Sequence, residues 1–209
     1  MKKISVFKAS ALCLVFVMLF NISFVACSAK KLVKISEMTF EELSESIEIG
    51  EYKGCNIDTQ GKSKDFAILQ HIEANTRIKE YPEGTVEYYV DQLKKQYKYY
   101  AEQAGMKYEA MLDELGEDNF TMQAEAKRLV KQDMIFSFIQ RKENITLSDE
   151  EKSTHFDRYV KKYSEKYNYE ESYVREELSA LVYESMLYDK TLEYLIINNT
   201  FIEDIVTDQ

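Results

Sequence analysis

The feature that most limits the possible folds of this chain is its near lack of helix-breaking residues. Its 209 residues include one Pro and six Gly, whereas Glu, Lys, Leu and Tyr are abundant. Pro and Gly are the least favourable residues inside a helix, and they are also common in the turns that join strands. A chain with several sheets would need more of them. The composition therefore predicts an all-α fold.

The clearest helical pattern lies between Asn119 and Glu151. Thr121 is predicted to cap a helix that continues without Gly or Pro to about Lys142. Ser148 and Glu151 have the spacing of a capping box, so a second helix is expected to begin after a short turn. The apolar residues of the first helix recur three and four positions apart and predict one apolar stripe: Ala126, Leu129, Val130, Met134 and Phe138.

Other parts of the chain carry weaker but consistent signals. A capping box at Thr39 predicts a brief helix, and alternating apolar residues with two Gly predict an extended segment over 47–57. Pro82 is expected in the first turn of its helix, where a missing N–H costs nothing. Further helices are predicted over residues 64–76, 83–104, 106–116, 149–167 and 170–198.

The first 26 residues are predicted to be a lipoprotein signal peptide. Three Lys within the first eight residues precede an uncharged, mostly apolar run over 9–26, and Cys27 follows a small residue. In such signals the Cys receives the lipid and becomes the first residue of the mature chain. An uncleaved transmembrane anchor is the alternative, which Asn21, Ser23 and the length of about 18 residues make less attractive. Both interpretations place the rest of the chain on the extracytoplasmic face of a bacterial cell membrane.

The charge of the chain limits its partners. The net charge is −10, and without the signal peptide 24 basic and 37 acidic side chains would remain, a net charge of −13. Nucleic-acid binding needs a positive surface that displaces counterions, so no nucleic acid is expected as a partner. A polybasic attachment to anionic lipid is equally disfavoured, which leaves acyl chains on Cys27 as the membrane anchor.

No constellation for catalysis, metal binding or a cofactor is evident, so the chain is not predicted to be an enzyme. Cys13 would leave with the signal and Cys27 would be lipidated, which leaves Cys55 without a disulfide partner. A partly buried structural Cys55 is favoured over a reactive thiol. The two histidines, His71 and His155, have no second ligand at metal-binding spacing. Paired acidic residues lie at helix starts, where they suit the helix dipole.

Three segments resemble the C-terminal domain of the trigger factor family. Residues 124–151, AEAKRLVKQDMIFSFIQRKENITLSDEE, are similar to a helix and turn of that domain. Gly50-Glu51-Tyr52-Lys53-Gly54 is similar to its strand before the inserted isomerase domain, and Pro82-Glu83-Gly84-Thr85-Val86 to a later helix start. The resemblance covers about residues 47–58 and 63–203.

Two parts of the family architecture are not matched. Nothing resembles the ribosome-binding domain, so no ribosome is expected as a partner. A link of about ten residues after the Tyr-Lys-Gly segment stands where the family has its isomerase domain, and a prolyl isomerase fold does not fit there. The resemblance implies an elongated, all-α, multi-helix peptide-binding module of trigger-factor C-terminal-like or SurA-like type, with helical arms.

The predicted organisation has four parts. Residues 1–26 are the signal peptide, and 27–62 hold the lipidated tether, a short helix and the extended segment. Residues 63–203 form the helical domain, and 204–209 form a tail.

The resemblance implies an ATP-independent chaperone in protein folding or transport that binds unfolded or nascent exported polypeptides. The alternative is a lipoprotein scaffold that holds one specific envelope partner. The net charge weakly favours basic over acidic clients. Sixteen Tyr and no Trp, with several Met, offer adaptable surface, although each residue could equally pack the core, and a homodimer through Tyr-rich faces stays open. The candidate client-binding residues are Tyr89, Tyr97, Tyr100, Met106, Tyr108, Met111, Phe120, Met134 and Phe138.

Overall fold

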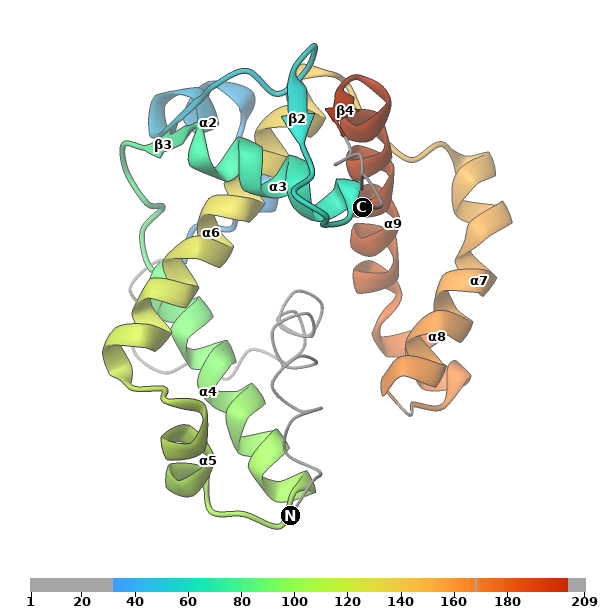
Figure 1. The fold of residues 1–209 in the computed structure, drawn as a ribbon. Coiled ribbons are helices and arrows are strands. Elements are labelled where there is room, and N and C mark those ends of the chain that lie inside the picture. The colour runs from blue at the N-terminus through green and yellow to red at the C-terminus, as the bar shows by residue number, and fades with distance from the viewer. Residues whose placement is uncertain (1–31, 168, 203–209) are drawn as a thin grey trace, which may run out of the picture. The chain divides into compact units, whose positions relative to one another are not determined.

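The computed structural model describes residues 32–167 and 169–202, and within them the chain is mainly helical (Figure 1). The signal peptide, Cys27 and the tail from residue 204 lie outside the described residues. After a 3-10 turn at Ile35–Glu37, the helices are α2 (Phe40–Ser46), α3 (Lys64–Ala74), α4 (Thr85–Gln103), α5 (Tyr108–Leu115), α6 (Asn119–Lys142), α7 (Asp149–Tyr167), α8 (Glu171–Glu177) and α9 (Ser179–Ile197). The strands are β1 (Ile47–Ile49), β2 (Asn56–Asp58), β3 (Thr76–Ile78) and β4 (Thr200–Ile202).

The chain divides into two compact units. Unit 1 contains the described residues up to Met38 together with Tyr81–Asp133, and unit 2 contains Thr39–Glu80 and the described residues from Met134 onward. Helix α6 therefore contributes its first part to unit 1 and its last turns to unit 2.

Unit 1 is built from α4, α5 and the first part of α6. Its core is mainly apolar, and its deeply buried side chains include Leu93, Met122, Ala126, Leu129 and Val130. Helix α4 begins two residues later than predicted, after Gly84, whose φ of 73° places it in the left-handed region that favours Gly. Pro82 thus lies before the helix and not in its first turn, and its carbonyl accepts the Thr85 N–H at 3.1 Å.

The cap of α6 also differs from the prediction. Asp118, not Thr121, accepts the free N–H groups of the first turn, those of Phe120 and Thr121, each at 2.8 Å. The Thr121 hydroxyl instead accepts the Asp118 N–H at 2.7 Å. The Asp118 carboxylate accepts two N–H groups, and the helix begins at Asn119, three residues earlier than a cap at Thr121 would give.

Unit 2 joins segments far apart in the chain through two small sheets. Strands β1 and β3 pair antiparallel, with Ile47 opposite Ile78, and β2 and β4 pair parallel, with Ile57 opposite Phe201. Strands β1 and β2 lie at the two ends of the predicted extended segment, whereas β3 and β4 were not predicted. Residues 39–58 therefore form part of the folded unit. Its core includes Leu43, Ile68, Ile72, Met134, Ile139, Val160, Val174 and Leu195.

The predicted turn between α6 and α7 is confirmed. Helix α6 ends at Lys142 and α7 spans Asp149–Tyr167, as expected. Ser148 and Glu151 form the capping box: the Glu151 N–H donates to the Ser148 hydroxyl at 3.1 Å, and the Ser148 N–H donates to the Glu151 carboxylate at 2.8 Å. Between the helices, Asn144 adopts a positive φ of 54° and the Ile145 N–H donates back to the Gln140 carbonyl.

The single helix predicted over 170–198 is wrong, because it is broken at Leu178 into α8 and α9. No Gly or Pro marks the break. Val174 and Val182, on either side, and Leu178 itself are buried. Apolar residues four positions apart therefore continue through the bend, so periodicity does not detect it.

We expect Gly50→Ala to destabilise unit 2. A Cβ at this position would lie 2.7 Å from the Asn75 carbonyl oxygen, which also accepts the Gly50 N–H at 2.9 Å. The β1–β3 connection would have to open, at a cost of about 1–3 kcal/mol in the free energy of unfolding, measured by urea denaturation. Gly61→Asn is the control, because Gly61 has open space and a positive φ that Asn tolerates. Equal losses in the two variants would contradict the steric explanation.

Candidate functional site

The candidate residues of unit 1 differ widely in exposure. Phe120, near the start of α6, is 79% exposed and is the most accessible of them. The other candidates of this unit are buried (Tyr89, Tyr97 and Met111) or half-buried (Tyr100, Met106 and Tyr108). Phe120 can therefore contact another polypeptide without any rearrangement, and the three half-buried residues offer part of their surface.

The two candidate residues of unit 2 are core residues in this structure. Met134 is fully buried, and the Phe138 ring packs against Phe40 with their centroids 5.1 Å apart. Both belong to the apolar stripe of α6, and that stripe packs inward here. Contact of any of these candidates with a client polypeptide stays a prediction.

The buried tyrosines of unit 1 place their hydroxyls against carboxylates. The Tyr89 hydroxyl on α4 donates to Asp133 on α6. Burial, together with the nearby carboxylates of Glu117 and Glu125, raises the pKa of Tyr97. A buried hydroxyl needs a partner, so these tyrosines tie helices together within the unit.

Several exposed apolar side chains were not among the predicted residues. The most exposed is Ile197, the last residue of α9, at 73%. The others are Phe66, Tyr99, Tyr169, Tyr173 and Ile202. Residue type alone did not indicate that these side chains are exposed, because Tyr and Ile are also common in helical cores. Tyr99 is one position before Tyr100 on a helix, so a strict count of helical positions could have indicated that both do not face inward.

In unit 2, a series of tyrosine rings leads from the core to the surface. Tyr163 contacts Tyr167, with ring centroids 5.4 Å apart, and Tyr167 contacts Tyr169 at 6.3 Å. Tyr169 contacts Tyr173 on α8 at 5.4 Å. Tyr163 and Tyr167 are buried whereas Tyr169 and Tyr173 are exposed, so the exposed rings rest on buried ones. Rings held in this way lose little conformational freedom when they bind a partner.

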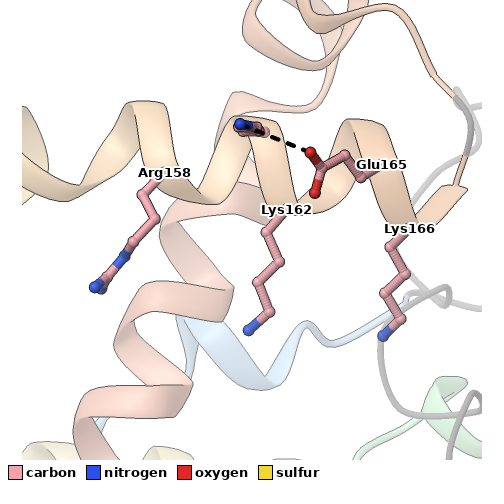
Figure 2. Close-up of a pocket in the computed structure, with 5 residues that line it drawn as sticks. Arg158, Lys162, Glu165 and Lys166 are labelled. Atoms are coloured by element: carbon pink, nitrogen blue, oxygen red, sulfur yellow. Dashed lines mark ion pairs between the residues drawn. The ribbon is translucent and has the colours of Figure 1, made fainter.

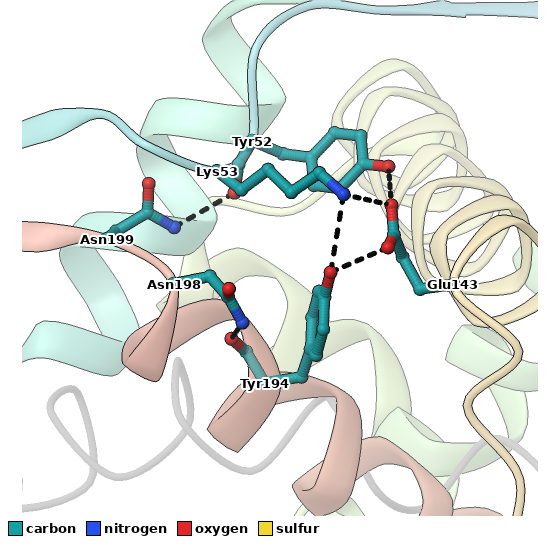
Figure 3. Close-up of polar contacts among 6 residues, drawn as sticks. All are labelled: Tyr52, Lys53, Glu143, Tyr194, Asn198 and Asn199. Carbon is teal, nitrogen blue, oxygen red and sulfur yellow. Dashed lines mark hydrogen bonds and ion pairs between the residues drawn. The ribbon is translucent and has the colours of Figure 1, made fainter.

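A polar cluster around Glu143 joins three segments of unit 2 (Figure 3). The Glu143 carboxylate accepts hydrogen bonds from the Tyr52 hydroxyl at 2.5 Å and the Tyr194 hydroxyl at 2.7 Å. Lys53 donates to the same carboxylate at 2.8 Å. Asn199 completes the connection by donating to the Tyr52 carbonyl at 2.9 Å. The end of α6, the loop after β1 and the end of α9 thus meet at one carboxylate.

This arrangement shifts the acidities of its members. The bonds from Lys53, Tyr52 and Tyr194 lower the pKa of Glu143 to about 2. Burial and the bond to Glu143 raise the pKa of Tyr52. The hydroxyls therefore stay protonated and the carboxylate stays ionised across the physiological range. The hydrogen bonds of the cluster thus join three segments of unit 2.

Two open hollows lie on the surface of unit 2. One is lined by the α6–α7 turn and by the end of α9: Glu143, Asn144, Ile145, Thr146, Ser148, Glu151, Lys190, Glu193, Tyr194 and Ile197. The other lies along α7 and is lined by Arg158, Lys161, Lys162, Glu165 and Lys166 (Figure 2). Both are shallow and bordered by charged side chains, so they suit a polypeptide segment better than an enclosed small molecule.

Cys55 is a buried free cysteine. Burial, with a smaller contribution from Glu51, raises the pKa of its thiol. A thiol of this kind forms little thiolate and reacts slowly. Its backbone carries the structural role, because the Cys55 N–H donates to the Asn199 side chain at 2.9 Å.

Over the described residues, no three His, Cys, Asp or Glu side chains are grouped as a metal site would require. In the same part of the chain, no helix is both long enough and apolar enough to span a membrane.

Over the described residues the chain is mainly helical, with open hollows and exposed aromatic side chains on its surface. Residues 39–197 match the family described as bacterial trigger factor protein (TF) C-terminus, and the chain belongs to this family. Membership of the family implies chaperone-like peptide binding by a non-catalytic domain. No curated protein and no solved structure matches the chain significantly.

We expect Glu143→Gln to lower the stability of unit 2 and to change its response to acid. The folded-state pKa of Glu143 is about 2, below the ordinary carboxyl value of 4.5, so its stabilising contribution is present above about pH 4.5 and is lost as pH falls toward 2. At pH 7 the variant should lose about 1–3 kcal/mol, typical for hydrogen bonds to a charged group.

The measurement is urea denaturation at several pH values between 7 and 2. Between pH 4.5 and 2 the variant should lose less stability than the wild-type chain, because it no longer has this carboxylate to protonate. Glu45→Gln, an exposed carboxylate on α2, is the control and should stay within about 0.5 kcal/mol. An unchanged acid response in Glu143→Gln would show that the cluster does not control stability.

Proposed function

We propose that this protein is an ATP-independent chaperone that binds unfolded or newly exported polypeptides and has no isomerase activity. The observation that carries the proposal is that both units of a trigger-factor C-terminal domain expose large apolar side chains. Phe120 does so in unit 1, and Ile197 and Tyr173 do so in unit 2. An unfolded chain presents apolar segments at intervals, so it can contact several such side chains at once.

Each of these contacts is weak by itself. Burying one exposed aromatic or aliphatic side chain contributes about 1.5–3 kcal/mol, which corresponds to no more than millimolar binding for a single point. Several weak contacts joined by a flexible client raise the overall affinity, while each can still dissociate quickly. Binding that is reversible and undemanding of sequence is what a holdase or foldase needs.

We also propose that the chain works at the extracytoplasmic face of a bacterial membrane, held there by lipid on Cys27. The three Lys near the start, the apolar run over 9–26 and the following Cys support this proposal. The anchor would restrict the protein to polypeptides that have just crossed the membrane.

The first test is the suppression of aggregation of several unrelated unfolded proteins by the chain from Ser28 onward. The double variant Phe120→Ser/Ile197→Ser should require about threefold or more protein for equal suppression, because it loses two apolar contacts. Gln123→Ala/Gln70→Ala, which alters two exposed polar residues in the same two units, should match the wild-type chain.

Two results would contradict the chaperone function. One is failure of the wild-type chain to suppress aggregation of any client while it binds one partner stoichiometrically, as a scaffold would. The other is equal suppression by the double variant and the wild-type chain, which would show that the exposed side chains are not contact points.

The anchor is tested by growth of bacteria that express the full chain with a clickable fatty-acid analogue. The wild-type protein should be labelled, whereas Cys27→Ser should carry no label and keep its leader, because lipidation precedes cleavage in lipoprotein maturation. Cys55→Ser should be labelled like the wild type. An unlabelled wild-type protein that retains its leader would favour the transmembrane anchor instead.

A further inference from the structure

Helix α7 carries a row of cations on one exposed face. Arg158, Lys162 and Lys166 are spaced four residues apart and point to the same side of the helix (Figure 2). All three side chains are exposed. These three residues, called the cationic row below, form a positively charged surface in a chain with 37 acidic and 27 basic residues.

The row is not explained by the stability of the helix. Like charges four positions apart repel each other and destabilise a helix, and here two such pairs follow in sequence. Acidic groups lie close to two lysines of α7. Lys162 lies 3.5 Å from Asp189 on α9, and Lys161, on the neighbouring row, lies 3.8 Å from Glu165. Both ion pairs are long and exposed, so a competing carboxylate can replace them at low cost.

Buried aromatic rings support the cationic ends. Arg158 and Lys162 lie over the face of Tyr159, at 5.4 and 5.2 Å from the ring centroid, and Lys166 lies 5.1 Å from that of Tyr167. Tyr159 and Tyr167 are themselves buried. Rings beneath long cationic side chains restrict their motion, so less conformational freedom is lost when an anion binds.

The spacing of the row indicates the kind of anion. Four residues of an α-helix rise by about 6 Å. In an extended polypeptide, side chains on one face are two residues apart, or about 6.6–6.8 Å. Carboxylates at alternate positions of an extended segment can therefore each approach one cation of the row.

We propose that the cationic row on α7 binds extended client segments that carry Asp or Glu at alternate positions. This proposal rests on the proposed chaperone function and gives one surface a client preference opposite to that expected from the net charge. At physiological ionic strength, charges more than about 8 Å apart are largely screened, so a narrow peptide segment interacts mainly with the row. A membrane surface is an extended plane and would also approach the acidic groups that flank the row, which favours a polypeptide as the occupant.

The test is the binding of short fluorescent peptides to the chain from Ser28 onward, followed by fluorescence anisotropy. The probe is a segment of an unfolded client that the chain binds, with three Asp placed at alternate positions and the other residues unchanged. One comparator has Asn in place of each Asp, and the other has the three Asp side by side. The alternating peptide should bind most tightly, and raising the salt concentration should weaken its binding.

The decisive variant is Arg158→Gln/Lys162→Gln/Lys166→Gln, which should raise the Kd for the alternating peptide about tenfold, since three exposed ion pairs together amount to about one order of magnitude. Lys95→Gln/Lys107→Gln/Lys127→Gln removes the same charge from exposed positions of unit 1 and should change the Kd less than about twofold. Circular dichroism and urea denaturation of both variants establish that they are folded.

Several outcomes would overturn the proposal. Equal binding of the alternating and contiguous peptides would show that the spacing of the Asp residues does not matter. Equal weakening of peptide binding by the two triple variants would show that only the net charge of the protein matters. Binding to phosphatidylglycerol vesicles but not to the acidic peptide would identify a membrane contact instead. Suppression of aggregation of a neutral client is measured in parallel. If it persists in the wild-type chain while the peptide does not bind, only this proposal fails, and if it is absent, the chaperone function fails as well.

Discussion

Three segments of unit 2 meet at one carboxylate, that of Glu143 directly after α6. It accepts hydrogen bonds from Tyr52, Lys53 and Tyr194, which come from positions 91, 90 and 51 residues away. The strands of this unit are three residues long and give few hydrogen bonds of their own. A charged acceptor with three donors from distant positions helps to fix which segments pack together, and such short strands contribute little to this. The Asn199 side chain extends the same tie to Tyr52 and Cys55.

By contrast, some large apolar and charged side chains remain exposed on the surface. Phe120 and Ile197 are large, apolar and exposed, and the cations of α7 form a row in an acidic chain. Neither feature stabilises the folded state, because exposed apolar area is still in contact with water and like charges repel. Both are suited to transient contact with a flexible polypeptide. The family domain supplies a helical framework, and we propose that these side chains contact the clients.

Local signals predicted the helices well and their interruptions poorly. The turn between α6 and α7 follows from a capping box and a residue at positive φ, which are encoded within ten residues. The break at Leu178 has no local cause, since both sides bury apolar residues with one helical period. Strands β3 and β4 were missed for a related reason. Three residues are too few to show alternation, and each strand exists only because a distant segment pairs with it.

The sequence by itself determined the helical class, the limits of α6 and α7 to within about three residues, and membership of the trigger factor C-terminal family. These depend on local composition and on short sequence motifs. The sequence also nominated Phe120 as a binding residue. Only the tertiary structure decided that Met134 and Phe138 lie in the core while Ile197 and Tyr173 lie outside. The physical reason is that an amphipathic pattern indicates which residues share a face of a helix. Whether that face is buried depends on the segments that pack against it.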